Sequence, residues 1–234
     1  MRAFLGVDAA MRTESYITDA DREKRVGSWL AEIRKQTAPR PRLRLDPARC
    51  ALVVIDANRY FADPAGACYL PAAGAAVPRI AELLSAWRGL GSTVAFTRHG
   101  HEGERDAGML GRFFGGFLDA RDPQAEIVER LAPLEDEPVV GKTTYDAFLS
   151  TPLESILRDR EIEQVLISGV LTHMCCETTA RSAFCRGFEV YVAADATASR
   201  NEELHVASLR SMADAVAVVL SVDEVLESCA RRRS

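Results

Sequence analysis

The stretch of sequence that decides the fold is EQVLISGVLTHMCCETTARSAFCRGFEVYVAAD, residues 163–195. It begins and ends with the short apolar runs EQVLISGV (163–170) and FEVYVAAD (188–195), which are typical of strands buried on both faces. Residues 174–186 between them have a helical pattern, and Gly187 is a suitable helix stop. A strand, a helix and a second strand in this order predict two parallel strands joined by a crossover helix.

The same alternation continues on both sides of this unit. It predicts an α/β fold, a Rossmann-like six-stranded parallel sheet with helices on both faces, in a domain over residues 46–234. Thr151 as N-cap, Pro152 at the first helical position and Glu154 closing a capping box predict a helix start. No G-x-G-x-x-G or P-loop motif supports nucleotide binding. The other expected strands are 50–56, 92–97, 137–141 and 215–220, and the other expected helices are 74–88, 123–131, 202–212 and one after residue 220.

Residues 1–45 differ from the rest and are interpreted as an N-terminal helical arm and linker. The linker, residues 39–44, is rich in proline and arginine and is expected to be extended. We expect the arm to pack on the domain or on a neighbouring subunit. An amphipathic helix is predicted within 19–35 by apolar residues spaced three and four apart, namely Val26, Trp29, Leu30 and Ile33.

Composition excludes several classes of protein. The chain has 234 residues, is 47% apolar and carries a net charge of −5, so it is neither disordered nor a nucleic-acid binder. It has no apolar run of the roughly 20 residues that a membrane helix needs, and its N-terminus soon becomes charged, so we expect neither a membrane partner nor a signal peptide. The six cysteines form no zinc or disulfide pattern. A cytoplasmic protein with reduced thiols is the expectation.

The chain uses arginine almost everywhere that it carries a positive charge. Of 29 basic residues only three are lysines, Lys24, Lys35 and Lys142. Lys142 is the only lysine after residue 35, and it follows the expected strand 137–141. This position indicates a role that requires a primary ammonium rather than a guanidinium.

Because ligands of parallel α/β sheets bind at the carboxyl ends of strands, the residues there are the first candidates for chemistry. Asp56 ends the first expected strand. One interpretation is a general acid or base whose pKa is raised by apolar surroundings. The other, equally favoured by the sequence, is a structural cap. Cys175 lies near a helix start, where free N–H groups stabilise a thiolate and could form an oxyanion hole. The alternative for Cys175 and Cys176 is a pair of inert core residues.

Three segments together resemble the isochorismatase-like cysteine hydrolase superfamily. They are VVIDANRYF after the first strand, GKTTYDAF…TPLESIL after the third, and GVLTHMCCETTARSAFCRGFEVYVAADATAS, and the similarity covers roughly residues 46–228. The resemblance implies a six-stranded parallel sheet, a homo-oligomer (dimer or tetramer), and a catalytic triad of Asp56, Lys142 and Cys175. Cys176 follows the implied nucleophile and is not expected to be catalytic.

The resemblance also implies a non-proline cis peptide between Val170 and Leu171. This peptide would aim the N–H of Leu171, together with that of Cys175, at a developing oxyanion. Nicotinamidases of this superfamily carry an Asp-x-His metal motif, where this chain has Thr97-Arg98-His99-Gly100-His101. Two histidines without a partner carboxylate make a poor metal site, so we predict no metal and no cofactor.

The leading hypothesis is a thiol hydrolase that cleaves an amide-type C–N bond of a small molecule through an acyl-enzyme on Cys175. Asp56 would move the proton, and Lys142 would lower the pKa of Cys175. The alternative is isochorismatase-type hydrolysis of a vinyl ether with Asp56 as general acid. Several short motifs near the strand ends resemble the isochorismatase branch of the superfamily. A third possibility is a non-catalytic thiol redox sensor or binding module. The expected substrate contacts are Tyr60, Phe61, His99, Phe114, Phe148 and His173.

Overall fold

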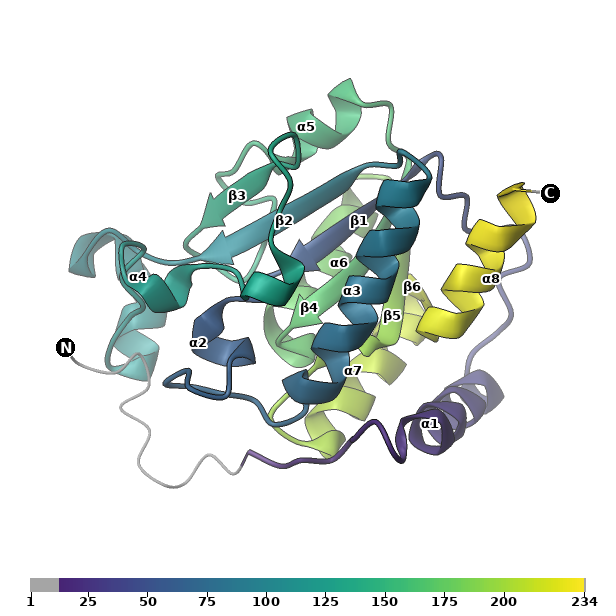
Figure 1. The fold of residues 1–234 in the computed structure, drawn as a ribbon, viewed down its shortest axis with the longest axis horizontal. Helices are drawn as coiled ribbons and strands as arrows, with labels where there is room; N and C mark the ends of the chain where they lie inside the picture. The colour runs from purple at the N-terminus through teal and green to yellow at the C-terminus, as the bar shows by residue number, and fades with distance from the viewer. Residues whose placement is uncertain (1–12, 234) are drawn as a thin grey trace.

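The computed structural model describes residues 13–233 and contains the expected six-stranded sheet. The strand order is β3-β2-β1-β4-β5-β6, and all neighbouring strands are parallel (Figure 1). This confirms the α/β fold class. The strands are β1 (Cys50–Ile55), β2 (Val94–His99), β3 (Val139–Lys142), β4 (Gln164–Val170), β5 (Glu189–Ala198) and β6 (Ala217–Leu220).

Helices cover both faces of the sheet. In Figure 1, α3 lies in front of the sheet and α6 lies behind it. The helices are α1 (Arg22–Gln36), α2 (Arg59–Ala62), α3 (Ala73–Gly89), α4 (Glu104–Phe114), α5 (Leu153–Asp159), α6 (Glu177–Cys185), α7 (Glu202–Ala215) and α8 (Val222–Arg233), with short helical turns at η1 (Pro123–Ala125), η2 (Glu129–Leu131) and η3 (Thr172–Cys176). Within residues 13–233 no helix is long and apolar enough to cross a membrane.

The apolar runs of the sequence became the centre of the sheet. Every residue of β1 and of β4 is buried, because these strands have a neighbour on each side and helices above and below. The two edge strands, β3 and β6, alternate between buried and more exposed positions. Because β1 and β4 are the two central strands and pair in parallel, their carboxyl ends lie side by side, with a further strand on each side.

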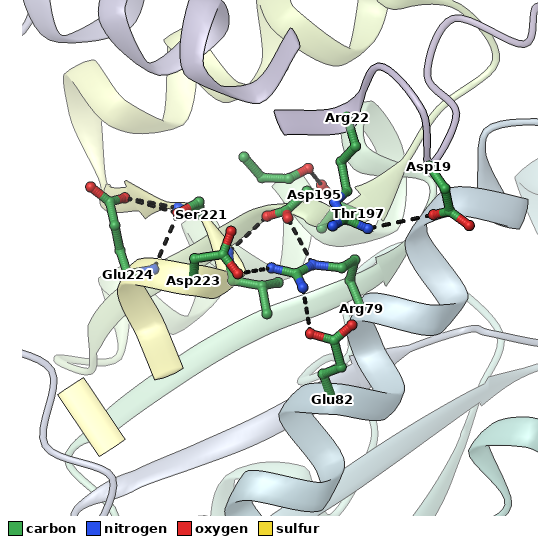
Figure 2. Close-up of polar contacts among 11 residues, drawn as sticks. Asp19, Arg22, Arg79, Glu82, Asp195, Thr197, Ser221, Asp223 and Glu224 are labelled. Carbon is green, nitrogen blue, oxygen red and sulfur yellow. Dashed lines mark hydrogen bonds and ion pairs between the residues drawn. The ribbon is translucent and has the colours of Figure 1, made fainter. Parts of the chain in front are cut away.

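A buried ionic cluster ties α3, β5 and α8 together. The side chain of Arg79 on α3 is 4% exposed, and its Nε donates to Asp195 Oδ2 on β5 at 3.0 Å. Asp195 Oδ1 accepts from the N–H of Val222 at the start of α8, and Arg79 also pairs with Glu82 and Asp223 (Figure 2). These bonds satisfy the buried charges and fix where α8 begins.

Two local expectations are wrong. Residues 123–131 form the short turns η1 and η2 instead of one helix, because residues between them bond to another segment. Asn58 and Ile127 form a β-bridge, and the N–H of Val128 donates to the carbonyl of Ala57. The capping box at α5 does not close: Thr151 Oγ1 accepts from the N–H of Leu153 at 3.3 Å, but Glu154 pairs with Arg186.

The predicted amphipathic helix of the arm is α1. Val26, Trp29, Leu30 and Ile33 form its buried face, as their spacing indicates. The helix lies beside α7 (Figure 1). Residues 1–12, on which the signal-peptide expectation rests, lie outside the described residues.

Candidate active site

The sheet brings three of the predicted site residues into contact. Asp56 directly follows β1, Lys142 ends β3, and Cys175 lies in the turn η3 after β4. Lys142 Nζ is 2.6 Å from Asp56 Oδ2 and 3.5 Å from Cys175 Sγ. All three residues are at most 7% exposed. A carboxylate, an ammonium and a thiol thus form one buried cluster at the carboxyl ends of the strands.

The ammonium of Lys142 has three partners inside the protein. It donates to the carbonyl oxygen of Thr144 at 2.7 Å and to Cys175 Sγ at 3.5 Å, and it forms an ion pair with Asp56 Oδ2. An ammonium has three donors that point to the corners of a tetrahedron, whereas a guanidinium is a flat fork. This geometry explains why an arginine-rich chain has a lysine at this position.

Asp56 is held by its backbone and by its side chain. Its φ angle of 44° lies in the left-handed region, where residues other than glycine are uncommon and which is often found at functional sites. Thr97 Oγ1 on β2 accepts from the Asp56 N–H at 3.1 Å and donates to Asp56 Oδ1 at 2.6 Å. With Lys142 on the other oxygen, the carboxylate has a fixed orientation.

The thiol of Cys175 is presented by a wound turn between β4 and α6. Residues Thr172–Cys176 form one π-type turn, and the Val170–Leu171 peptide bond is cis, as the resemblance implies. Single π-turns are frequent at functional sites. Cys176 is fully buried and its N–H donates to the carbonyl of Leu171 at 3.2 Å.

Gly169, near the end of β4, permits this strand to lie close to β1 just before the turn begins. Its φ angle is 108°, and a Cβ atom there would lie 2.0 Å from the carbonyl oxygen of Ile55.

Gly169→Ala is therefore expected to destabilise the fold by about 3 kcal/mol or more, through the clash and the φ angle together. Gly27→Ala in α1, where a Cβ meets no atom within 4 Å, should instead stabilise by roughly 0.5–1 kcal/mol. Urea unfolding of both variants measures this. A tolerated Gly169→Ala would contradict the close approach.

Burial and the neighbouring charges together set the resting protonation of the cluster. Burial acts to raise the pKa of Asp56, but Lys142, His99 and the hydrogen bonds from Lys142 and Thr97 outweigh it and lower the pKa. Burial acts to lower the pKa of Lys142, but Asp56 and Cys175 raise it to about 12. Burial raises the pKa of Cys175 to about 12 despite Lys142, and Asp56 adds to that rise. The resting cluster is therefore a carboxylate, an ammonium and a neutral thiol.

This result differs from the sequence-based expectation at two points. Lys142 does favour the thiolate of Cys175, but burial has the larger effect and the net pKa of the thiol is raised. The pKa of Asp56 is lowered and not raised, because its surroundings are a lysine and a threonine hydroxyl rather than apolar side chains. Asp56 is suited to accept a proton.

His99 ends β2, and His101 follows it two residues later. The rings of His99 and His101 lie 4.9 Å apart, and Asp106 Oδ2 is 3.8 Å from Nδ1 of His101. Burial and Lys142 lower the pKa of His99 to about 3. Among residues 13–233 no group of three His, Cys, Asp or Glu side chains could hold a metal ion.

A cavity of about 900 Å³ opens between α2, η1 and α4. Its lining includes Tyr60, Phe117 and Leu118, but none of the three clustered residues. Three aromatic rings lie in a row between Lys142 and this cavity. His99 on β2 pairs in register with Lys142 on β3, and its ring lies 4.9 Å from the ring of His101. The ring of His101 lies 5.9 Å from that of Phe117, which lines the cavity.

The other predicted contact residues have different places. Phe61 is buried edge-on against Tyr60, and Phe114 on α4 is half-buried beside Phe113. His173 lies in the turn η3, with its Nδ1 bonded to Ser199 Oγ. Phe148 is 5% exposed and stacks on Phe188, which precedes β5 at the opposite end of the sheet. We assign Phe148 to the core and give it no substrate role.

Sequence reasoning missed two groups that hold the site. The sequence could have indicated Thr97 as a site residue, since it is a polar residue at the end of the apolar run of β2. The carbonyl of Thr144 could not be indicated by the sequence, because a residue of any type has a backbone carbonyl. A parallel α/β sheet with a buried acid, amine and thiol at its strand ends defines this protein as an α/β enzyme.

Comparison with known proteins gives the family. Residues 50–224 match the family model described as the isochorismatase domain, so the chain belongs to the isochorismatase family of hydrolases. It is 36% identical over 182 residues to Nicotinamidase 3 of Arabidopsis thaliana, covering 76% of this chain and 87% of that protein. It is 31% identical over 182 residues to Enterobactin synthase component B of Escherichia coli (strain K12), covering 77% of this chain and 64% of that protein.

A solved structure is similar in fold. A cysteine hydrolase from Pseudomonas syringae pv. phaseolicola 1448A superposes with a TM-score of 0.78 at 29% identity, covering 81% of this chain and 96% of that chain. The family match begins at Cys50, so residues 13–49 lie outside it.

Proposed function

We propose that the protein is a thiol-dependent hydrolase that cleaves an amide-type C–N bond of a small molecule through an acyl-enzyme on Cys175. The observation that carries this proposal is the contact of Lys142 with both Asp56 Oδ2 and Cys175 Sγ. It links a base to a nucleophile through one buried cation. The similarity to Nicotinamidase 3 supports an amide substrate.

The proposed reaction has two halves. In the first, Asp56 takes the proton of Cys175 while the sulfur attacks the amide carbon, and a tetrahedral oxyanion forms. The N–H groups of Leu171 and Cys175 are the proposed donors to this oxyanion. The C–N bond then breaks, and the proton held by Asp56 goes to the leaving nitrogen.

In the second half, water attacks the thioester carbon and gives its proton to Asp56. The C–S bond breaks, the acid product leaves, and Cys175 regains its proton from Asp56. Lys142 stays protonated throughout, and its charge stabilises the thiolate as it forms. We propose Tyr60, Phe61, His99, Phe114 and His173 as substrate contacts, with the cavity beside Tyr60 receiving the substituent of the substrate.

The protonation state of Asp56 separates this mechanism from the vinyl ether alternative. An acid that protonates a vinyl ether must carry a proton at the working pH, which requires a raised pKa. Lys142 and Thr97 instead lower the pKa of Asp56. The site therefore favours proton acceptance from Cys175.

A panel of substrates tests the proposal. Purified enzyme is assayed with small primary amides, N-carbamoyl compounds, esters and isochorismate, as wild type and as Asp56→Asn. We expect release of ammonia or amine from at least one amide, and a loss of roughly 10³-fold or more in the variant. Pyruvate release from isochorismate, with no amide cleaved, would overturn the assignment.

The pH dependence of kcat/KM follows from the same cluster. Activity needs ionised Asp56, whose pKa is lowered, so the acid limb should lie below the ordinary carboxyl range near 4. The resting thiol and ammonium keep their protons up to about pH 12, so neither group creates a limb near neutrality. We expect a flat profile between about pH 5 and 8. A limb near 6.5 would indicate a titrating histidine or a raised carboxyl, contrary to this account.

A further inference from the structure

The turn that carries Cys175 is fastened by two side chains at its start. Thr172 Oγ1 bonds to His205 Nδ1 at 2.9 Å, and Ser208 Oγ donates to the carbonyl of Thr172 at 3.1 Å. His173, the next residue, is bonded through Nδ1 to Ser199 Oγ. The position of the nucleophile, two residues further on, therefore depends on what holds His205 and Ser199.

The N-terminal arm holds both of these residues. The phenol oxygen of Tyr16 accepts the backbone N–H of Ser199 at 2.9 Å. The Tyr16 ring lies 5.4 Å from the His205 ring, and Trp29 meets the same ring edge-on at 5.0 Å. Tyr16 is 5% exposed and Trp29 6%, so both contacts are buried.

Polar bonds lock the arm in this register. Trp29 Nε1 donates to Glu202 Oε1 at 2.8 Å, and Arg25 pairs with the same carboxylate at 3.1 Å. The N–H of Glu14 donates to the carbonyl of Arg200 at 2.7 Å. Each bond joins the arm to the segment 200–202, which directly follows Ser199. The arm contacts this segment specifically, and the contact does not depend on apolar burial alone.

We propose that the arm is a part of the catalytic unit, in which Tyr16 is a positioning residue that holds the nucleophile turn through Ser199 and His205. The arm lies outside the residues matched by the family model, whereas every group that it holds lies inside them. The chain therefore supplies, from its own N-terminal extension, part of the support of the nucleophile. The proposal concerns the position of the turn and rests on the proposed function only for the role of Cys175.

Tyr16→Phe tests the link, because it removes the acceptor for Ser199 and keeps the ring on His205. We expect hydrogen exchange of the amides in 172–176 to become about tenfold faster. Alkylation of Cys175 by iodoacetamide, mapped by peptide mass, should become at least threefold faster as the turn loosens. Cys185 is exposed on α6 and serves as the reference for reagent activity. With an amide substrate, kcat should fall about tenfold while KM stays within twofold.

Ile33→Ala is the matched control. Ile33 is buried on the same face of α1, a full helical turn beyond Trp29. It should lower the melting temperature and leave the turn, the alkylation rate and kcat unchanged. Equal effects of Ile33→Ala and Tyr16→Phe on the turn would show that the arm contributes general stability only, which overturns the proposal.

Ser199→Ala tests the same connection between Tyr16 and the nucleophile turn by a change inside the domain, because it removes the hydroxyl that bonds His173. The double variant Tyr16→Phe with Ser199→Ala should loosen the turn no more than the stronger single variant, since both act through one connection. Effects on exchange that multiply would contradict the link. A loosened turn in an enzyme that hydrolyses no amide would refute the proposed function alone, and an unaltered turn with full amidase activity would refute the positioning role alone.

Discussion

Cys175→Ala is expected to lower amide turnover by roughly 10⁴-fold or more, because no other group in the cluster can form the acyl intermediate. The residual rate would come from substrate binding and oxyanion stabilisation, which do not need the sulfur. The variant should fold, since alanine fills most of the space of a buried cysteine. The measurement is kcat and KM on the best amide of the panel, with the melting temperature as a check of folding.

Cys176→Ala is the control for this prediction. Cys176 is the adjacent residue and is buried like Cys175, so its truncation costs a similar amount of stability, about 1 kcal/mol. Turnover should stay within a few-fold of wild type. Activity that survives Cys175→Ala but is lost in Asp56→Asn would contradict the acyl-enzyme and favour the vinyl ether mechanism.

Replacement of Lys142 is the second large effect. Lys142→Met leaves the carboxylate of Asp56 buried without its cation, which is expected to cost about 3–5 kcal/mol of stability and roughly 10³-fold in turnover. The pKa of Asp56 would rise as Lys142 is removed, so the acid limb of kcat/KM should move to higher pH. Urea unfolding and the pH profile measure the two consequences separately.

Lys142→Arg distinguishes the shape of the cation from its charge. The lysine side chain is fully buried and its ammonium contacts Asp56, Thr144 and Cys175 at once, so a planar guanidinium has no room to reproduce the three contacts. We expect a loss of about 10²-fold even though the charge is kept. Lys35→Met, at an exposed surface pair with Glu32, should change neither stability by more than about 1 kcal/mol nor turnover. A fully active Lys142→Arg would contradict the role given to the ammonium.

Apolar periodicity was sufficient to predict the sheet. The strands β1, β4 and β5 are buried on both faces, so their sequences are continuous apolar runs with clear ends. Their parallel order places the strand ends side by side, which made Asp56 and Lys142 candidates for chemistry, whereas their assignment to a triad depended on the family resemblance. The choice of Cys175 over an inert core cysteine depended on the family resemblance.

Other features depend on contacts between distant segments. The segment 123–131 has a helical composition, but its backbone bonds to Ala57 and Asn58 and is held partly extended. The helix α4 was not predicted: only Ala107 among its residues is buried, and Gly108, with a φ angle of 50°, interrupts it. The raised pKa of Cys175 follows from the depth of burial, which spacing along the chain does not give.

The covalent intermediate tests the central claim most directly. Enzyme is mixed with a substrate amide, quenched in acid within milliseconds to seconds, and analysed by intact mass and by mapping of the peptide that contains Cys175. The account predicts a mass increase equal to the acyl group, located on Cys175, removed by hydroxylamine and absent in Cys175→Ala. Turnover of an amide without any adduct on Cys175 under pre-steady-state conditions, or with an adduct on another residue, would contradict it.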